Sequence, residues 1–179
     1  MIKKSFSLIA LLILCMCSYG QVSIADKSSA NSFPLSSAQL LNDDNDATSV
    51  KTVSHLFAGD IGMVTGKIPA VKTELSQTSY LVIAGTIDNN RWIKELAAAN
   101  RINIDSLKGQ WERYSVYVVK NPYPGVKQAL VVAGSDRRAV AYGLFDISEK
   151  MGVSPWYWWA DVPVKKRKAV FVTINYFVS

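Results

Sequence analysis

Two segments of the chain, forty-nine residues apart, repeat one pattern of strand, glycine turn and helix start. Residues 80–89 read YLVIAGTIDN and residues 129–138 read ALVVAGSDRR, so that Gly85 matches Gly134. Both apolar runs are unbroken, which is typical of parallel strands whose two faces are covered by other elements. A strand that leads into a helix twice in this way predicts an α/β fold.

Apolar residues that recur at helical spacing predict three helices. Gly66 and Pro69 end the first helix, and Gly152 ends the third, which follows the second repeat. Gly143 lies inside the third helix and allows it to approach the sheet closely. The apolar faces are Val50, Val53, Phe57, Ile61 and Val64 in the first helix, Trp92, Ile93, Leu96 and Ala97 in the second, and Val140, Leu144, Ile147 and Met151 in the third.

Further strands are expected between and after the repeats. Residues 114–119 are rich in β-forming side chains, and turn residues at 121–125 lead from them into 129–133, which predicts a hairpin. A last β-rich run spans residues 169–178. The chain is therefore expected to be an α/β domain, with a mixed β-sheet of about four or five strands and two or three main helices.

The first 20 residues have the form of a secretory signal peptide. Two lysines precede an apolar run at 6–17, which is about half the length that spans a bilayer. Ser18 and Gly20 are the small residues expected before a cleavage site, so we expect a mature chain that begins at Gln21 and is periplasmic or extracellular. Lipid attachment to Cys15 or Cys17 is the alternative, although the residues before each are not small.

Removal of this leader leaves 159 residues without cysteine, so disulfides and thiol chemistry are not expected. This length suits one domain, placed at 34–179 after a flexible lead at 21–33 that is rich in Ser, Ala and Asn. The formal net charge falls from +6 to +4, because two lysines leave with the leader. Much of the remaining excess lies at 165–168, where we expect a solvated turn. Export and the lack of interleaved aromatics argue against nucleic-acid binding.

Motifs for cofactor, metal or nucleophilic chemistry are weak. The acidic loop at 42–46 resembles a calcium loop only in composition, so helix-start chemistry is the favoured interpretation. Gly85 and Gly134 precede helix starts, but neither has the glycines of a nucleotide-binding fingerprint, and close packing explains them better. The single histidine, His55, falls within a predicted helix, and no G-x-S-x-G motif occurs. We expect no cofactor and no metal site.

Aromatic residues are unusually dense at 155–163, after the third predicted helix. Because Trp158 and Trp159 are consecutive, they must point in different directions, so at least one is expected to face a ligand or a partner. Together with Trp156 and Asp161 they are the candidate contact residues for a substrate or a partner domain. The rings could stack on a sugar while Asp161 orients a hydroxyl, although a structural role for Asp161 in its loop is favoured.

Glycoside hydrolysis requires two carboxylates that flank one bond. Asp136 has the position of a helix cap. Asp146 and Glu149 lie three residues apart on a polar helix face, where pairing with Lys150 or Arg138 is expected. The carboxylate beside the tryptophans therefore has no obvious catalytic partner.

The segment 134–172 resembles the N-terminal domain of glycoside hydrolase family 115, the xylan α-1,2-glucuronidases. It includes the block SPWYWWADVP at 154–163. The other matching residues are Asp60-Ile61, Val64-Thr65-Gly66, Pro69 and Lys108-Gly109-Gln110-Trp111-Glu112. The family usually has lysine in place of Gln110, and related sequences tend to have glycine in place of Ala139. The resemblance covers about residues 33–178.

This resemblance implies a fold similar to the small α/β domain that precedes the barrel in hexosaminidases and glucuronidases. In the family, a (β/α)8 barrel follows and supplies the carboxylates that release 4-O-methyl-glucuronic acid from xylan. We therefore expect a chain that is truncated before the barrel, contains no catalytic residue of its own and packs on such a barrel.

Two alternatives remain open. One is a free-standing carbohydrate-binding protein whose tryptophans bind glucuronoxylan oligosaccharides, and the other is an independent small hydrolase. Neither a membrane span nor a nucleic-acid partner is expected.

Overall fold

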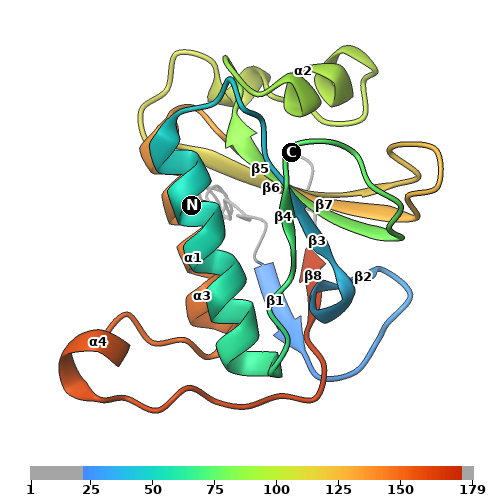
Figure 1. The fold of residues 1–179 in the computed structure, drawn as a ribbon. Coiled ribbons are helices and arrows are strands. Elements are labelled where there is room, and N and C mark those ends of the chain that lie inside the picture. The colour runs from blue at the N-terminus through green and yellow to red at the C-terminus, as the bar shows by residue number, and fades with distance from the viewer. Residues whose placement is uncertain (1–21, 175–179) are drawn as a thin grey trace, which may run out of the picture.

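A computed structural model describes residues 22–174 and shows an α/β fold with two β-sheets (Figure 1). The expected signal peptide lies outside the described residues. The elements in chain order are β1 (Val22–Ala25), β2 (Ser32–Pro34), the 3-10 turn η1 (Leu35–Ser37), β3 (Gln39–Leu41), α1 (Thr48–Thr65), β4 (Val71–Lys72), β5 (Tyr80–Thr86), α2 (Arg91–Ala98), the 3-10 turn η2 (Asp105–Leu107), β6 (Tyr114–Lys120), β7 (Gln128–Gly134), α3 (Arg137–Met151), α4 (Tyr157–Ala160) and β8 (Phe171–Ile174).

The larger sheet contains the two repeated segments as neighbouring parallel strands. Its strand order is β4-β3-β5-β7-β6. β5 and β7 pair from Tyr80 opposite Gln128 to Thr86 opposite Gly134. β3 is parallel to both β4 and β5, whereas β6 is antiparallel to β7 and forms the predicted hairpin with it. The expected α/β fold with a mixed five-stranded sheet is thus confirmed.

Helices cover both faces of this sheet. α1 and α3 lie side by side against one face, and α2 packs on the other (Figure 1). β7 shows the division, because alternate side chains of a strand point to opposite faces. Leu130 and Val132 belong to the core beneath α1 and α3, while Ala129 and Val131 belong to the core beneath α2. The unbroken apolar runs of the sequence reflect these two cores.

A second sheet, with antiparallel strand order β1-β8-β2, closes the core beneath α1 and α3. Val22 of β1, Phe33 of β2 and Val172 of β8 are all buried in this core. β1 and most of β2 come from residues 21–33, for which the sequence predicted a flexible lead. The segment forms strands because it pairs with β8, at the other end of the described chain. A local sequence pattern could not predict so distant a partner.

The ends of the helices follow the predicted signals. α1 stops at Gly66 and α3 at Gly152, whose φ values of +79° and +112° lie in the left-handed region that favours glycine. Asp136 caps α3, because its carboxylate accepts hydrogen bonds from the backbone N–H groups of Arg138 (2.8 Å) and Ala139 (2.9 Å). Local sequence signals therefore set the ends of α1 and α3.

Candidate functional site

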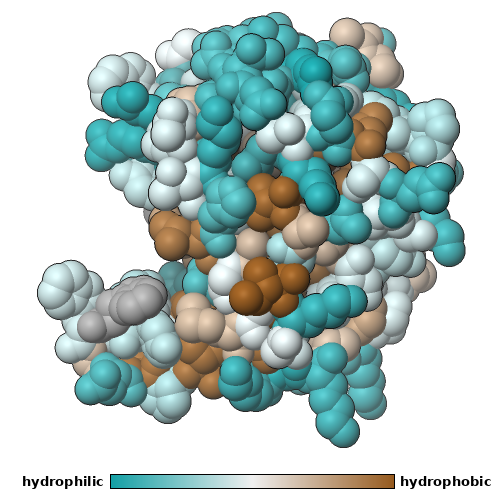
Figure 2. Space-filling model, in the orientation of Figure 1, coloured by the Kyte–Doolittle hydropathy of each residue, from teal (hydrophilic) through white to brown (hydrophobic). Residues whose placement is uncertain are grey.

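The aromatic residues 155–163 form an arm that leaves the body of the molecule after α3. Within it, α4 is one turn, closed by hydrogen bonds from the N–H groups of Trp159 (3.1 Å) and Ala160 (2.9 Å) to the Trp156 carbonyl. Asp161 ends the turn with a left-handed φ of +49°. Figure 1 shows the arm at the lower left, and in Figure 2 an open notch separates it from the body.

Three of the four predicted contact residues have exposed side chains on this arm. Trp156 is 64% exposed and Trp159 86%, and Asp161 is exposed as well. Trp158 lies in the same turn, with its side chain outside the described part of the structure, and Tyr157 is half-buried. The fold thus gathers large aromatic rings and one carboxylate on a projecting turn. Large aromatic side chains exposed together on one short turn are typical of sites that bind a partner or a ligand.

Two of the other carboxylates considered for glycoside hydrolysis, Asp146 and Asp136, have structural partners. Asp146 pairs with Lys150 at 2.6 Å, one of the two predicted pairings. At Asp136, partial burial acts to raise the pKa, but three backbone hydrogen bonds and the charge of Arg138 outweigh it and lower the pKa. Such a carboxylate is held ionised as a helix cap and is a poor proton donor for hydrolysis. Within residues 22–174, no group of three or more His, Cys, Asp or Glu residues could hold a metal ion.

A buried polar network at the carboxyl ends of β3 and β5 was missed by the sequence analysis. Asp46, which is 4% exposed, accepts hydrogen bonds from the Thr86 N–H (2.8 Å), the Thr86 hydroxyl (2.9 Å) and the Asn90 amide (3.4 Å). Asp43, 1% exposed, accepts one from the N–H of Arg91 (2.5 Å). The two carboxylates therefore fasten the loop before α1 to the turn before α2.

This network corrects the interpretation of the acidic loop at 42–46. The N-cap of α1 is Ala47, and no side chain caps the helix. The loop therefore supplies tertiary hydrogen bonds in place of the expected helix-start chemistry. The buried carboxylate oxygens already accept hydrogen bonds from N–H and O–H groups. This is typical of buried acids in a polar network rather than of the ligands in a calcium loop.

The glycine turns are filled by neighbouring atoms, as the packing interpretation predicted. A Cβ at Gly85 would lie 2.6 Å from the Asp46 carboxylate, and a Cβ at Gly134 would lie 2.7 Å from the backbone nitrogen of Val140. Real Cβ atoms do not approach other atoms this closely, so both positions require glycine. The space beside each turn is occupied by the chain itself, and neither turn is a candidate anion site.

His55 is exposed on α1, which agrees with the interpretation of a surface histidine. Among the described helices, none is both long enough and apolar enough to cross a membrane. Neither His55 nor these helices supply a further functional group to the arm.

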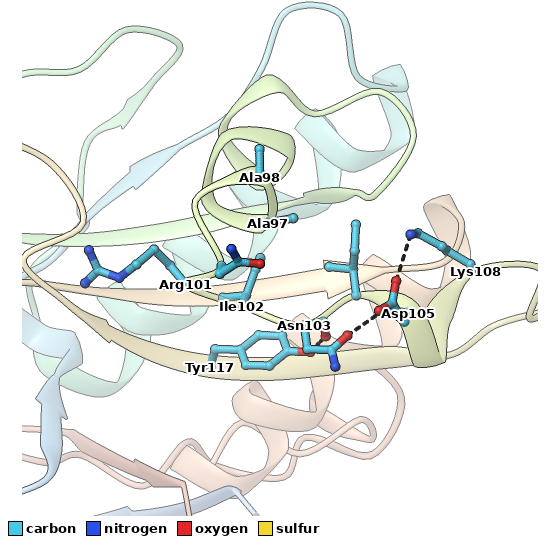
Figure 3. Close-up of a pocket in the computed structure, with 10 residues that line it drawn as sticks. Ala97, Ala98, Arg101, Ile102, Asn103, Asp105, Lys108 and Tyr117 are labelled. Carbon is cyan, nitrogen blue, oxygen red and sulfur yellow. Dashed lines mark hydrogen bonds and ion pairs between the residues drawn. The ribbon is translucent and has the colours of Figure 1, made fainter.

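An open pocket of about 740 Å³ lies between α2 and the edge strand β6 (Figure 3). Its polar groups bind one another: Lys108 pairs with Asp105 at 2.7 Å, and the Tyr117 hydroxyl donates to the Asn103 carbonyl. Burial raises the pKa of Tyr117 and outweighs an opposing hydrogen bond, so the phenol remains a donor. Arg101 donates to the backbone of β6. The polar groups of the lining are therefore already paired with other groups of the chain, and we do not treat the pocket as a second candidate site.

Trp111 is a further exposed aromatic residue, to which the sequence analysis gave no role in a site. It is 84% exposed, on the loop between η2 and β6. Its setting in the polar stretch KGQWER, without apolar neighbours at helix or strand spacing, was the available signal.

Comparisons with known proteins place this geometry in a wider context. No protein-family model matches the sequence, and no curated protein matches it. Among solved structures, the chain is similar to a family GH115 4-O-methyl-α-glucuronidase with specificity for decorated arabinogalactans. The identity is 30% and the TM-score 0.59, and the match covers 79% of this chain and 16% of that chain. A structure described as CpGH84D matches with 14% identity and a TM-score of 0.49, over 86% of this chain and 22% of that one.

The chain thus spans about a sixth of the length of the GH115 enzyme that it matches. The identity of 30% applies to a match that covers 79% of this chain. The chain therefore folds as a GH115-like domain, similar to a small part of a much longer glycoside hydrolase.

Proposed function

We propose that this chain is the N-terminal noncatalytic domain of an exported α-glucuronidase, and that it packs on a catalytic (β/α)8 barrel lying outside these 179 residues. In this proposal Trp156, Trp158, Trp159 and Asp161 contact the barrel or the rim of its substrate cleft. The observation that carries the proposal is the match of 79% of this chain to only 16% of a GH115 4-O-methyl-α-glucuronidase. A domain that forms so small a part of an enzyme is expected to have a large neighbour.

Exposure of the arm supports a docking role. An aromatic side chain that buries 150–250 Å² contributes on the order of 4–6 kcal/mol at about 25 cal/mol per Å², before the cost of ordering is subtracted. Trp156 and Trp159 obtain little of this stabilisation within the described chain, since they are 64% and 86% exposed. Contact with a second domain would bury them, and tryptophan is enriched among residues that dominate binding energy at interfaces.

The proposed substrate is a polysaccharide that carries 4-O-methyl-glucuronic acid. The sequence resemblance points to xylan, whereas the matched structure belongs to an enzyme specific for decorated arabinogalactans. Both cases share the 4-O-methyl-glucuronosyl group, which is the part of the substrate released by the reaction. We therefore propose removal of this group from xylan as the activity of the complete enzyme.

The test is direct binding between the purified chain and the remaining part of a GH115 α-glucuronidase, produced separately. Tryptophan fluorescence is expected to shift on mixing, and titration gives the dissociation constant. The double variant Trp156→Ala/Trp159→Ala should weaken binding at least tenfold, because each ring is an exposed anchor. Leu56→Ser, which changes an exposed apolar residue on α1, is the matched control and should leave binding within twofold.

Three outcomes would contradict the proposal or its assignment of residues. If the two parts do not associate, the accessory-domain function is wrong. If they associate equally well in the double variant, the arm is not the contact. A fluorescence shift with glucuronoxylan oligosaccharides that is lost in the double variant, without association of the two parts, would instead support the alternative of a free-standing carbohydrate-binding module.

A further inference from the structure

The loop at 108–113, which carries the exposed ring of Trp111, is attached to the turn that precedes α3. Next to it, the Glu112 N–H donates to the Asp136 carboxylate (2.7 Å), the same carboxylate that caps α3. Arg113 exchanges two hydrogen bonds with Ser135: its N–H donates to the serine hydroxyl (3.0 Å), and its carbonyl accepts from the serine N–H (2.8 Å). The backbone beside the tryptophan is therefore attached to the turn between β7 and α3.

Backbone conformation also distinguishes this loop. Glu112 adopts a φ of +54°, which costs a residue other than glycine about 1–3 kcal/mol and persists only where the surroundings enforce it. An ion pair of 2.8 Å between Glu112 and Arg138 adds to the hydrogen bonds that enforce it. Despite these restraints the Trp111 side chain is 84% exposed. The loop therefore presents the indole ring to solvent from a restrained backbone, so that little backbone entropy remains to be lost on binding.

Basic residues outnumber acidic ones in this loop and in the turn to which it is attached. Lys108 is paired with Asp105, which leaves Arg113, Arg137 and Arg138 against Glu112 and Asp136 in the loop and the adjoining turn. The excess is one positive charge at the start of a 15-residue helix, whose N-terminal end is itself electropositive.

Two of these guanidinium groups have free donors. Arg138 uses one terminal nitrogen for Glu112 and the other for the Tyr142 hydroxyl (3.4 Å), and its side chain is 61% exposed, so further N–H groups face solvent. Arg137 is exposed, and it has no ion-pair partner within residues 22–174. Such groups can hold a carboxylate through two parallel hydrogen bonds.

We propose that Trp111, Arg137 and Arg138 form a binding site for a saccharide that carries a carboxylate. The flat ring stacks on the apolar face of a sugar, and the guanidinium groups bind the uronic-acid carboxylate. The site lies at the first turn of α3, whereas the arm follows the last turn, and a 15-residue helix separates them by about 20 Å. The choice of a glucuronate-bearing ligand rests on the proposed function; the geometry of the site does not.

The probe is xylotriose that carries one 4-O-methyl-α-glucuronosyl group, titrated into the purified chain by calorimetry and by NMR of the indole N–H signals. Xylotetraose is the neutral comparison and should bind at least tenfold more weakly. Trp111→Ala and Arg137→Gln should each raise the dissociation constant for the acidic saccharide about tenfold. Arg137 is preferred to Arg138 for substitution, because Arg138 also supports the loop through Glu112. Leu56→Ser, which changes an exposed apolar residue on α1 outside both proposed sites, is the control and should change binding less than twofold.

Circular dichroism establishes that each variant is folded. The saccharide site is wrong if the acidic probe does not bind, if the neutral probe binds equally well, or if Trp111→Ala leaves binding unchanged. It is also wrong if Trp111→Ala weakens association with the remaining part of the glucuronidase while no saccharide binds, since Trp111 would then be a protein contact. Failure of the proposed function is read separately, from the absence of association between the chain and that enzyme part.

Discussion

Asp60 and Ser148 form a polar contact between α1 and α3. The Ser148 hydroxyl donates to the Asp60 carboxylate at 2.6 Å, and the serine is 3% exposed. Burial raises the pKa of Asp60, and the hydrogen bond from Ser148 opposes this shift without cancelling it. The ionised form of Asp60 is therefore less favourable in the folded chain than in the unfolded one.

The sign of the resulting pH dependence follows from proton linkage. Since the folded chain holds this proton more tightly, Asp60 lowers the free energy of unfolding as pH rises from the unfolded pKa through the higher folded pKa. Above that window its contribution is constant and unfavourable. Asp60→Asn keeps an acceptor for Ser148 and removes the charge, so we expect a higher free energy of unfolding at pH 7. We also expect the variant to lose the part of the pH dependence that Asp60 contributes. Urea unfolding from pH 4 to pH 7 measures both.

Asp44→Asn is the comparison at an exposed aspartate in the loop before α1. Its profile gives the effect of removing one carboxylate from the surface of the chain. A profile of Asp60→Asn that is parallel to that of the unmodified chain throughout would show that the Asp60 carboxyl does not titrate differently in the folded state.

At the scale of the element, α3 packs against the sheet through Gly143. A Cβ at this position would lie 2.6 Å from Val132 Cγ1 and 2.9 Å from the ring of Tyr114. Gly143→Ala gains helix propensity of about 1 kcal/mol, but overpacking of a close contact costs about 1–3 kcal/mol. We expect a net loss of stability, measured as a lower urea midpoint. The burial of Tyr114 and its interaction with Asp146, which raise its pKa to about 12, leave the ring little freedom to move aside.

Gly59 provides the matched control within α1. No atom lies within 4 Å of a Cβ added there, so Gly59→Ala should stabilise the chain by about 0.5–1 kcal/mol. The two substitutions are chemically identical and should have opposite signs. If Gly143→Ala were also stabilising, α3 would have room to move away from the sheet, and glycine would not be required for their approach.

For the molecule as a whole, the small sheet connects the two ends of the described chain. β1 pairs with β8 along four residues, Val22 is 7% exposed in the core, and Asp26 pairs with Arg167 at 2.5 Å. A chain that begins at Ser28 lacks all three features. Burial of one valine contributes about 1.5–3 kcal/mol, whereas hydrogen bonds of about 1 kcal/mol each are largely offset by the cost of about 1–2 kcal/mol for ordering each residue. We therefore expect a loss of up to about 3 kcal/mol relative to a chain that begins at Gln21.

Chemical unfolding of the two chains measures this difference. Asp26→Asn in the longer chain isolates the ion pair, which should contribute less than about 1 kcal/mol because Asp26 is 63% exposed. Equal midpoints for the long and short chains would support the flexible lead that the sequence predicted for residues 21–33.

Local patterns predicted much of the larger sheet and its helices. The ends of α1 and α3 at Gly66 and Gly152, the cap at Asp136 and the hairpin of β6 and β7 all depend on residues within a few positions of one another. The density of tryptophans likewise directed attention to the arm. Such features can be read from sequence because their causes, side-chain periodicity and turn chemistry, are short in range.

Other features depend on contacts between residues far apart in the sequence, which local patterns did not predict. Asp46 was interpreted as part of a helix start, yet it binds Thr86, forty residues away. Arg167 belongs to a basic run expected to be a solvated turn, yet its side chain is 13% exposed and donates to the Met151 carbonyl at 3.1 Å as well as to Asp26. The attachment of the Trp111 loop to the start of α3 likewise depends on remote contacts, those of Glu112 with Asp136 and Arg138.

The sequence by itself therefore determined the α/β class, the extents of the principal helices and the place of the aromatic arm. Only the tertiary structure decided that the N-terminal residues complete a sheet, which acids and cations are buried, and which aromatic rings face solvent. The physical reason is that the energy of a buried polar group or an edge strand depends on its partner, and the partner is chosen by the packing of the whole chain rather than by neighbouring residues.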